Sequence, residues 1–236
     1  MTLLELLTEW RRRIDDVSAP FLWSKADGVS YLNQAEREAA ERAKLILDTT
    51  TKAVCDINGK ADVGTYPLHP KILEIESCTW QGRFLEGKSR SELDDGRIYS
   101  GYRKYGWEAF GSAVDWRTLK GTPYFYLDPQ ERFLTLVRIP EVAAPIHLTA
   151  YRLPLEDMKE DTDEPELVER HHFNLVDWMC ALSYLKQDTE TYNPKASLEA
   201  EARFTANFGV KVSANTRRQQ RERRSNQVRM NPDWGG

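Results

Sequence analysis

The sequence has few cysteines and no long apolar run. Its three cysteines, Cys55, Cys78 and Cys180, are an odd number without a CxxC pair, so neither a disulfide framework nor a zinc site is predicted. No segment approaches the run of about eighteen apolar residues that a membrane helix requires. Glu5 and Glu9 stand where a signal peptide would have its basic and apolar regions. These absences favour a chain that functions in a reducing interior and without a membrane.

Motifs of enzyme catalysis are missing as well. The sequence contains no GxxxxGK[ST], no GxGxxG after a strand, no GxSxG and no HExxH. The adjacent pair His171 and His172 offers metal ligands or a general base. Neighbouring residues of a helix point about 100° apart, however, so the two rings do not easily share an ion, and a packing or interface role is favoured. We therefore predict that the protein is not an enzyme and has neither a cofactor nor a metal.

Charge is distributed unevenly along the chain. The net charge is -4, but residues 210–236 hold seven basic residues against two acidic ones, a net +5. An acidic cluster extends from Glu156 to Glu169. This cluster lacks the glycine and the ligand spacing of a calcium loop, so a solvated or interface face is predicted. One chain thus has two oppositely charged surfaces, which head-to-tail packing of identical copies can use.

Four segments have the apolar spacing of three and four residues that is typical of amphipathic helices. They are residues 2–17, 24–50, 165–189 and 194–208. Capping signals mark their ends, namely Thr2 with Glu5, Ser24 with Asp27, Asn193 before Pro194, and Gly209. Because two helices lie near each end of the chain, we expect them to meet in one bundle.

The middle of the chain has short apolar stretches separated by turn residues, as in strands. The predicted fold class is α+β: a helical bundle formed by the N- and C-terminal helices, an inserted antiparallel β-rich subdomain and an extended C-terminal tail. The corresponding divisions are 1–51, 52–153, 154–209 and 210–236. Within the insert, residues 96–121 are rich in glycine and aromatic residues and are predicted to form a long loop. Stacking of nucleobases or sugars on this loop is one hypothesis, and a local core or subunit interface is the favoured one.

Charged residues of the second predicted helix are candidates for contacts between subunits. Small residues at Ala35, Ala39 and Ala43 allow a neighbouring helix to approach. The charged side chains are expected to face solvent or another subunit, and those assigned to lateral contacts are Glu36, Arg37, Glu41 and Arg42.

The C-terminal tail has three interpretations. Its arginines suit the phosphates of a nucleic acid or an acidic protein groove, and an idle solvated tail is the third. Val228, Met230, Pro232 and Trp234 favour the protein groove, because they are spaced like the anchors of an extended peptide. With so little apolar surface, the tail does not offset its own ordering entropy and is expected to be disordered or held by a partner.

Several segments, in this order, resemble the head-to-tail adaptor (connector) proteins of tailed bacteriophages. They are Phe21-Leu22-Trp23-Ser24 with residues 31–40, Tyr66-Pro67-Leu68 with Pro70-Lys71-Ile72-Leu73, Gly121-Thr122-Pro123-Tyr124-Phe125-Tyr126, Pro165-Glu166-Leu167 with His171 or His172, and Asp188 with residues 196–209. The similarity covers most of residues 1–209.

The resemblance implies a structural subunit of the virion neck, assembled in the host cytoplasm. It implies a ring of identical copies, expected to be dodecameric, that joins the portal protein to the tail (nozzle or tube) protein. DNA would pass through the ring without specific binding, which an acidic body suits. On this view the tail docks on the portal through Arg217, Arg218, Arg221, Arg223, Arg224, Met230 and Trp234. The alternative is a nucleic-acid-binding module that uses the same basic tail.

Overall fold

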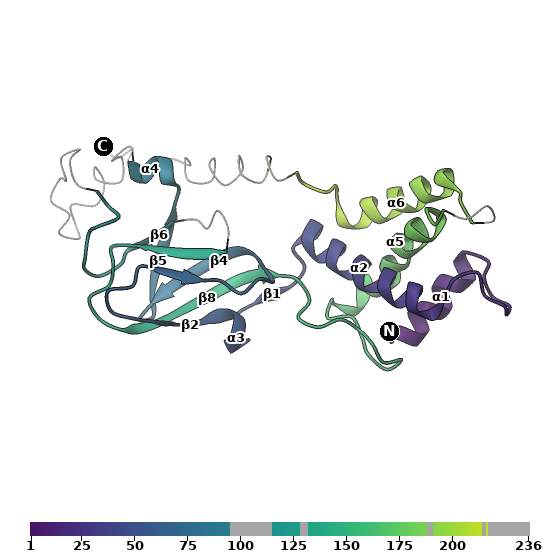
Figure 1. Cartoon of the computed structure of the whole chain (residues 1–236), viewed down its shortest axis with the longest axis horizontal. Coiled ribbons are helices and arrows are strands. Elements are labelled where there is room, and N and C mark those ends of the chain that lie inside the picture. The colour runs from purple at the N-terminus through teal and green to yellow at the C-terminus, as the bar shows by residue number, and fades with distance from the viewer. Residues whose placement is uncertain (95–114, 128–131, 188–190, 214–215, 217–236) are drawn as a thin grey trace, which may run out of the picture. The chain divides into compact units, whose positions relative to one another are not determined.

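The chain folds into two units, one built mainly of helices and one built around a sheet (Figure 1). The computed structural model describes residues 1–94, 115–127, 132–187, 191–213 and 216. The helical unit joins two segments that are far apart in the sequence, Met1–Leu47 and Tyr151–Lys211. The sheet unit contains Asp48–Ala150. The finer division predicted at residues 51, 153 and 209 stays a prediction.

Helices from both ends of the chain pack together in the helical unit, as the sequence predicts. They are α1 (Leu3–Arg13), α2 (Lys25–Ala43), α5 (His172–Tyr184) and α6 (Pro194–Phe208), with the 3-10 turn η3 (Glu169–His171) before α5. Helix α5 packs against each of the other three helices (Figure 1). Its residues Leu175, Val176 and Met179 are fully buried, so α5 forms the centre of this core.

Local sequence signals set the helix starts. Thr2 and Glu5 form a reciprocal capping box at α1, and Ser24 and Asp27 form a second one at α2. The two helices approach closely at Gly28 of α2. A Cβ atom there would lie 2.6 Å from the Trp10 ring of α1, so the absence of a side chain allows this contact.

Three predicted helices are longer than the observed ones. The first was predicted to reach residue 17, but α1 ends at Arg13. The second was predicted to reach residue 50, but α2 ends at Ala43, and the next residue, Lys44, has a left-handed backbone (φ 50°). The chain then forms the short strand β1 (Leu47–Asp48), because a position in the sheet overrides the helical spacing. The third was predicted from residue 165, yet the α-helix begins only at His172. The backbone N–H of Glu166 instead donates to a side chain of α2.

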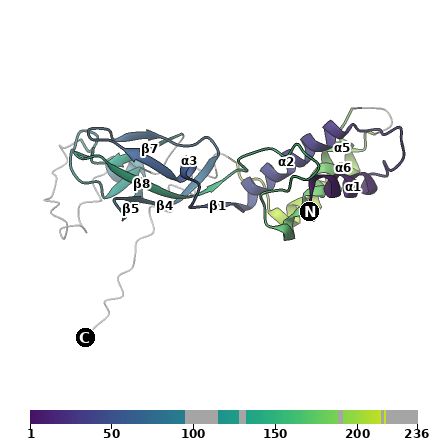
Figure 2. The ribbon, with the colours of Figure 1, turned by 90° about the horizontal axis from the view of Figure 1, so that it is seen from below.

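Within the described residues, the second unit is built around a mixed sheet of eight strands. The order along the sheet is β1-β8-β4-β5-β6-β7-β3, with β2 paired to β8. Besides β1, the strands are β2 (Asp56–Gly59), β3 (Thr65–Pro67), β4 (Ile72–Trp80), β5 (Arg83–Lys88), β6 (Phe125–Leu127), β7 (Phe133–Val137) and β8 (Ala144–Arg152). Figure 2 shows the sheet from another side.

The prediction of a purely antiparallel subdomain is wrong, because the described sheet unit also contains parallel pairing. Strands β5 and β6 run parallel, with Glu86 opposite Phe125 and Lys88 opposite Leu127. Parallel neighbours need a crossover of a dozen or more residues, and the long segment between Lys88 and Phe125 provides it. That segment includes the short helix α4 (Arg90–Asp94). The region predicted as a loop at 96–121 falls mostly outside the described residues.

Apolar residues cover both faces of the middle of the sheet. One cluster contains Tyr126, Leu134 and Leu136, and the other contains Phe125, Leu127 and Val137 together with Leu93 and Trp116. Alternate residues of β6 therefore enter different clusters, and all three are buried. This explains why the β6 sequence is continuously apolar, without the alternation of a half-exposed strand. Before β2, residues Lys52–Cys55 form α3, a helical turn that the strand prediction missed.

Candidate partner-binding site at the root of the C-terminal extension

The C-terminal extension leaves the helical unit beside the end of α2. Helix α6 ends at Phe208 and is capped by Gly209, whose φ of 83° lies in the region that favours glycine. The next residue, Val210, is 70% exposed, so apolar burial does not hold the chain here. Side chains of α2 hold it instead. We call Glu38, Glu41, Arg42, Gly209 and Lys211 the extension root.

Arg42 is the centre of the extension root. Its side chain is only 3% exposed, and its guanidinium carbon lies 4.9 Å from the ring centroid of Trp178 and 5.2 Å from that of Phe204. Nη1 donates to the hydroxyl of Thr205 at 3.0 Å and to the carbonyl of Gly209 at 3.2 Å. A buried guanidinium is stable only when its donors are hydrogen-bonded. The oxygens of Thr205 and Gly209 at the end of α6 meet part of this requirement for Arg42.

Glu38 links Arg42 to the first residues of the extension. Its Oε1 accepts from Nε of Arg42 at 2.9 Å, and its Oε2 accepts from Nζ of Lys211 at 2.8 Å. Burial acts to raise the pKa of Glu38, but the bonds from Lys211 and Arg42 outweigh it and lower the pKa below its ordinary value. The Lys211 ammonium also lies 3.9 Å from Glu41. The carboxylates of α2 thus draw the extension back onto the helix.

The four residues predicted for lateral contacts occupy different environments. Glu41 and Arg42 belong to the extension root, and Arg37 pairs with Asp157 at the surface. The expectation that Glu36 faces outward is wrong, since it is 2% exposed. Its Oε1 accepts the backbone N–H of Glu166 at 2.6 Å. Helical spacing missed this burial because the covering segment lies 130 residues away in the sequence. The assignment of these residues to subunit contacts stays a prediction.

The residues predicted to dock on the portal fall outside the described residues. They are Arg217, Arg218, Arg221, Arg223, Arg224, Met230 and Trp234. Their role stays a prediction, and the extension root is the described part of the chain that leads to them.

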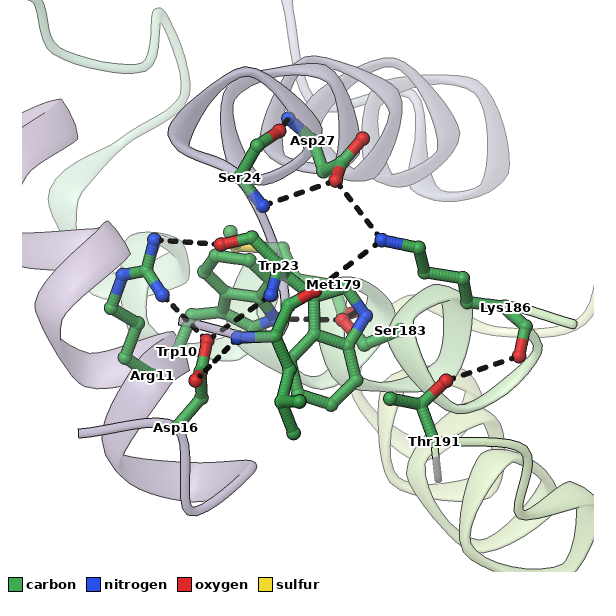
Figure 3. A network of polar contacts seen from close by, with 11 residues as sticks. Trp10, Arg11, Asp16, Trp23, Ser24, Asp27, Met179, Ser183, Lys186 and Thr191 are labelled. Carbon is green, nitrogen blue, oxygen red and sulfur yellow. Dashed lines mark hydrogen bonds and ion pairs between the residues drawn. The ribbon is translucent and has the colours of Figure 1, made fainter. Parts of the chain in front are cut away.

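A second exposed surface lies at the corner between α1 and α2. Asp16 is 4% exposed, and its carboxylate accepts from the Arg11 guanidinium at 2.6 Å (Figure 3). It also accepts from the backbone N–H of Leu22 at 2.9 Å. Arg11 donates in addition to the carbonyl of Trp23. These bonds were not predicted from the sequence. They fix the loop that carries Phe21, whose ring is covered by the Arg11 guanidinium at 3.8 Å.

This corner borders an open groove of about 630 Å³. Leu4, Phe21 and Leu22 line it and are about half exposed. Lys186 also lines the groove, and its Nζ lies 3.4 Å from both Asp27 and the Leu22 carbonyl (Figure 3). Apolar side chains line part of the groove, and its lining cations are paired within the chain, so its charge does not indicate a particular ligand.

Much of the predicted acidic cluster binds within its own chain. Glu166 pairs with Arg152, and Asp163 accepts the backbone N–H groups of Lys159 and Glu160. These N–H groups lower the pKa of Asp163. Glu169 also lies 3.9 Å from the N-terminal amine, but its side chain is 84% exposed. The acidic segment is therefore a structured loop of the helical unit, and only some of its carboxylates face solvent.

The histidine pair and the cysteines have structural environments. His172 is 2% exposed, and its Nε2 donates to the Leu167 carbonyl at 2.7 Å, which leaves Nδ1 to accept from the N-terminal amine at 3.0 Å. Burial raises the thiol pKa of Cys55 to about 11 and those of Cys78 and Cys180 to about 12, so these thiols are poor nucleophiles. Across the described ranges, no three His, Cys, Asp or Glu side chains gather as a metal site would require.

The comparisons with known proteins agree with a structural role. Residues 1–231 match the family model described as SU10 adaptor protein. No curated protein matches the chain. None of the helices in the described residues has both the length and the apolar character to cross a bilayer.

Proposed function

Since this chain belongs to the SU10 adaptor protein family, a family of phage head-tail adaptors, we propose that it is the subunit of a ring that joins the portal to the tail and surrounds the DNA channel. The match over residues 1–231 is the observation that carries this proposal. Portal protein, tail protein and further copies of the same chain are the proposed partners. The proposed role is mechanical and non-enzymatic, with the virion neck as the proposed location.

The extension root supports portal docking by the tail. The described chain is held on α2 as far as Lys211, and the basic residues with the apolar anchors follow at 217–234. A protein groove with acidic walls and apolar pockets would satisfy both groups of side chains. The exposed charges of α2, such as Arg37, remain candidates for contacts between neighbouring copies.

A chain that ends at Ser213 tests this proposal. This truncation keeps Lys211 and the contacts of the extension root, so the helical unit is expected to retain its stability. We expect the truncated chain to lose association with the portal ring by at least about 100-fold, because the docking side chains are removed. Binding to the portal is measured by sedimentation or by surface-based affinity.

DNA binding is measured on the full-length chain and on the chain that ends at Ser213, over a range of salt concentrations. If the truncation abolishes DNA binding and leaves portal binding intact, the tail is a nucleic-acid-binding module and the docking proposal is wrong. A full-length variant with the five arginines of 217–224 replaced by glutamine separates charge from the apolar anchors. If the tail docks on the portal through its arginines and its apolar anchors together, this variant should lose only part of its affinity for the portal. If the tail instead binds DNA phosphates, the variant should lose DNA affinity, and the salt dependence of the remaining binding should become weaker.

A further inference from the structure

We infer that Glu38, Arg42 and Lys211 fix the direction in which the C-terminal extension leaves the helical unit, and so present it to its partner. This inference rests on the proposed function for the identity of the partner. The last carbonyls of a helix have no partner within the helix, and a cation near them is favourable. The last turn of α6 has no basic residue of its own. Arg42 of α2 takes that place and binds the Gly209 carbonyl.

Arg42 holds a defined orientation. Its guanidinium binds Glu38, Thr205 and Gly209 while lying near two aromatic rings. A planar fork with several donors can make these bonds together, whereas an ammonium at the same place cannot. The carbonyl of Gly209 is therefore held in one position relative to α2.

Lys211 continues the same network two residues after Gly209. Val210 is 70% exposed and Gly209 has no side chain, so burial does little to hold residues 209–211. The bond from Lys211 to Glu38 holds the backbone at this point. A segment whose direction is already set loses less conformational freedom on binding than one that samples many directions. The extension root thus lowers the entropic cost of docking.

The test compares two identical substitutions at different places. Lys211→Met removes the bond to Glu38, and Lys195→Met removes an exposed lysine of α6 whose side chain is 88% exposed. We expect Lys211→Met to weaken binding to the portal ring about 10-fold and Lys195→Met to leave it unchanged. Lys211→Arg keeps a cation for Glu38 and is expected to retain nearly full affinity. Arg42→Lys is expected to weaken binding as Lys211→Met does, because the fork is lost.

A second measurement on the free chain separates positioning from a direct contact with the partner. Hydrogen exchange of the Gly209 amide, which donates to the Thr205 carbonyl at 2.8 Å, is expected to accelerate in Lys211→Met and in Glu38→Gln, and to stay unchanged in Lys195→Met. The inference is overturned if Lys211→Met binds the portal as tightly as Lys195→Met, or if its affinity falls with no change in exchange. If the wild-type chain itself does not bind the portal ring, the proposed function fails, which is a different outcome.

Discussion

Replacing Glu36 with glutamine is expected to raise the free energy of unfolding by about 3 kcal/mol near pH 8. Burial raises the pKa of Glu36 to about 7, because its effect exceeds the lowering by the backbone N–H groups of Glu166 and Leu167. The negative charges of Glu166 and Asp157 also act to raise this pKa. Near pH 8 the folded chain must therefore keep an unfavourable buried charge. Glutamine has no charge and keeps one carbonyl oxygen, which can accept from one of these two N–H groups.

The pH dependence gives the sign of the effect. The carboxyl group is protonated more readily in the folded chain than in the unfolded chain, so its contribution to stability falls as the pH rises from about 4.5 to about 7. Chemical denaturation across this range should show wild type and Glu36→Gln almost equal below about pH 4 and separating above it. Glu199→Gln, an exposed change on α6, is the control and should stay within about 0.5 kcal/mol. Equal stability of Glu36→Gln and wild type near pH 8 would contradict the buried charge.

Replacing Asp177 with asparagine is expected to lower the free energy of unfolding by about 3 kcal/mol. The Asp177 side chain is 7% exposed, and its Oδ1 accepts from Arg13 of α1 at 2.9 Å and from Arg203 of α6 at 3.0 Å. This carboxylate of α5 therefore ties two other helices together. Asparagine has nearly the same shape, so the loss reports the missing charge between two arginines and little change in packing.

Asp157→Asn is the matched control for this change. Asp157 also pairs with an arginine, Arg37, but both side chains are more than 40% exposed. An exposed pair contributes about 0–1 kcal/mol because water screens it. Thermal and urea unfolding of the two variants should therefore differ clearly. Equal losses at the two positions would show that burial of Asp177 does not matter.

Local signals in the sequence predicted much of the helical unit. The caps at Thr2, Ser24 and Asn193 are observed with the predicted hydrogen bonds, because a cap depends only on residues three positions away. The sheet was harder to predict. Strand β6 pairs with β5 in parallel only because the long segment between them brings it back to the edge of β5. Strand β1 forms because it pairs with β8, which lies far along the sequence. Neither is set by neighbours in the sequence.

The candidate site could be predicted only in part for the same reason. Glu41 and Arg42 stand out in the sequence as charged residues on a helix, but their described contacts reach Lys211 and Gly209 from far along the chain. A helical pattern shows that Arg42 is charged and does not show that Trp178 and Phe204 cover it. The burial of Glu36 was missed in the same way. The spacing of residues within one helix does not show which distant segment packs against that helix.

The mass of the portal ring mixed with this chain tests the central claim most directly. The claim is that copies of the chain assemble on the portal and that residues after Ser213 attach them. Native mass spectrometry is expected to show the portal ring gaining a fixed whole number of full-length chains, and gaining none of the chain that ends at Ser213. A portal ring whose mass does not change with excess full-length chain would contradict the account.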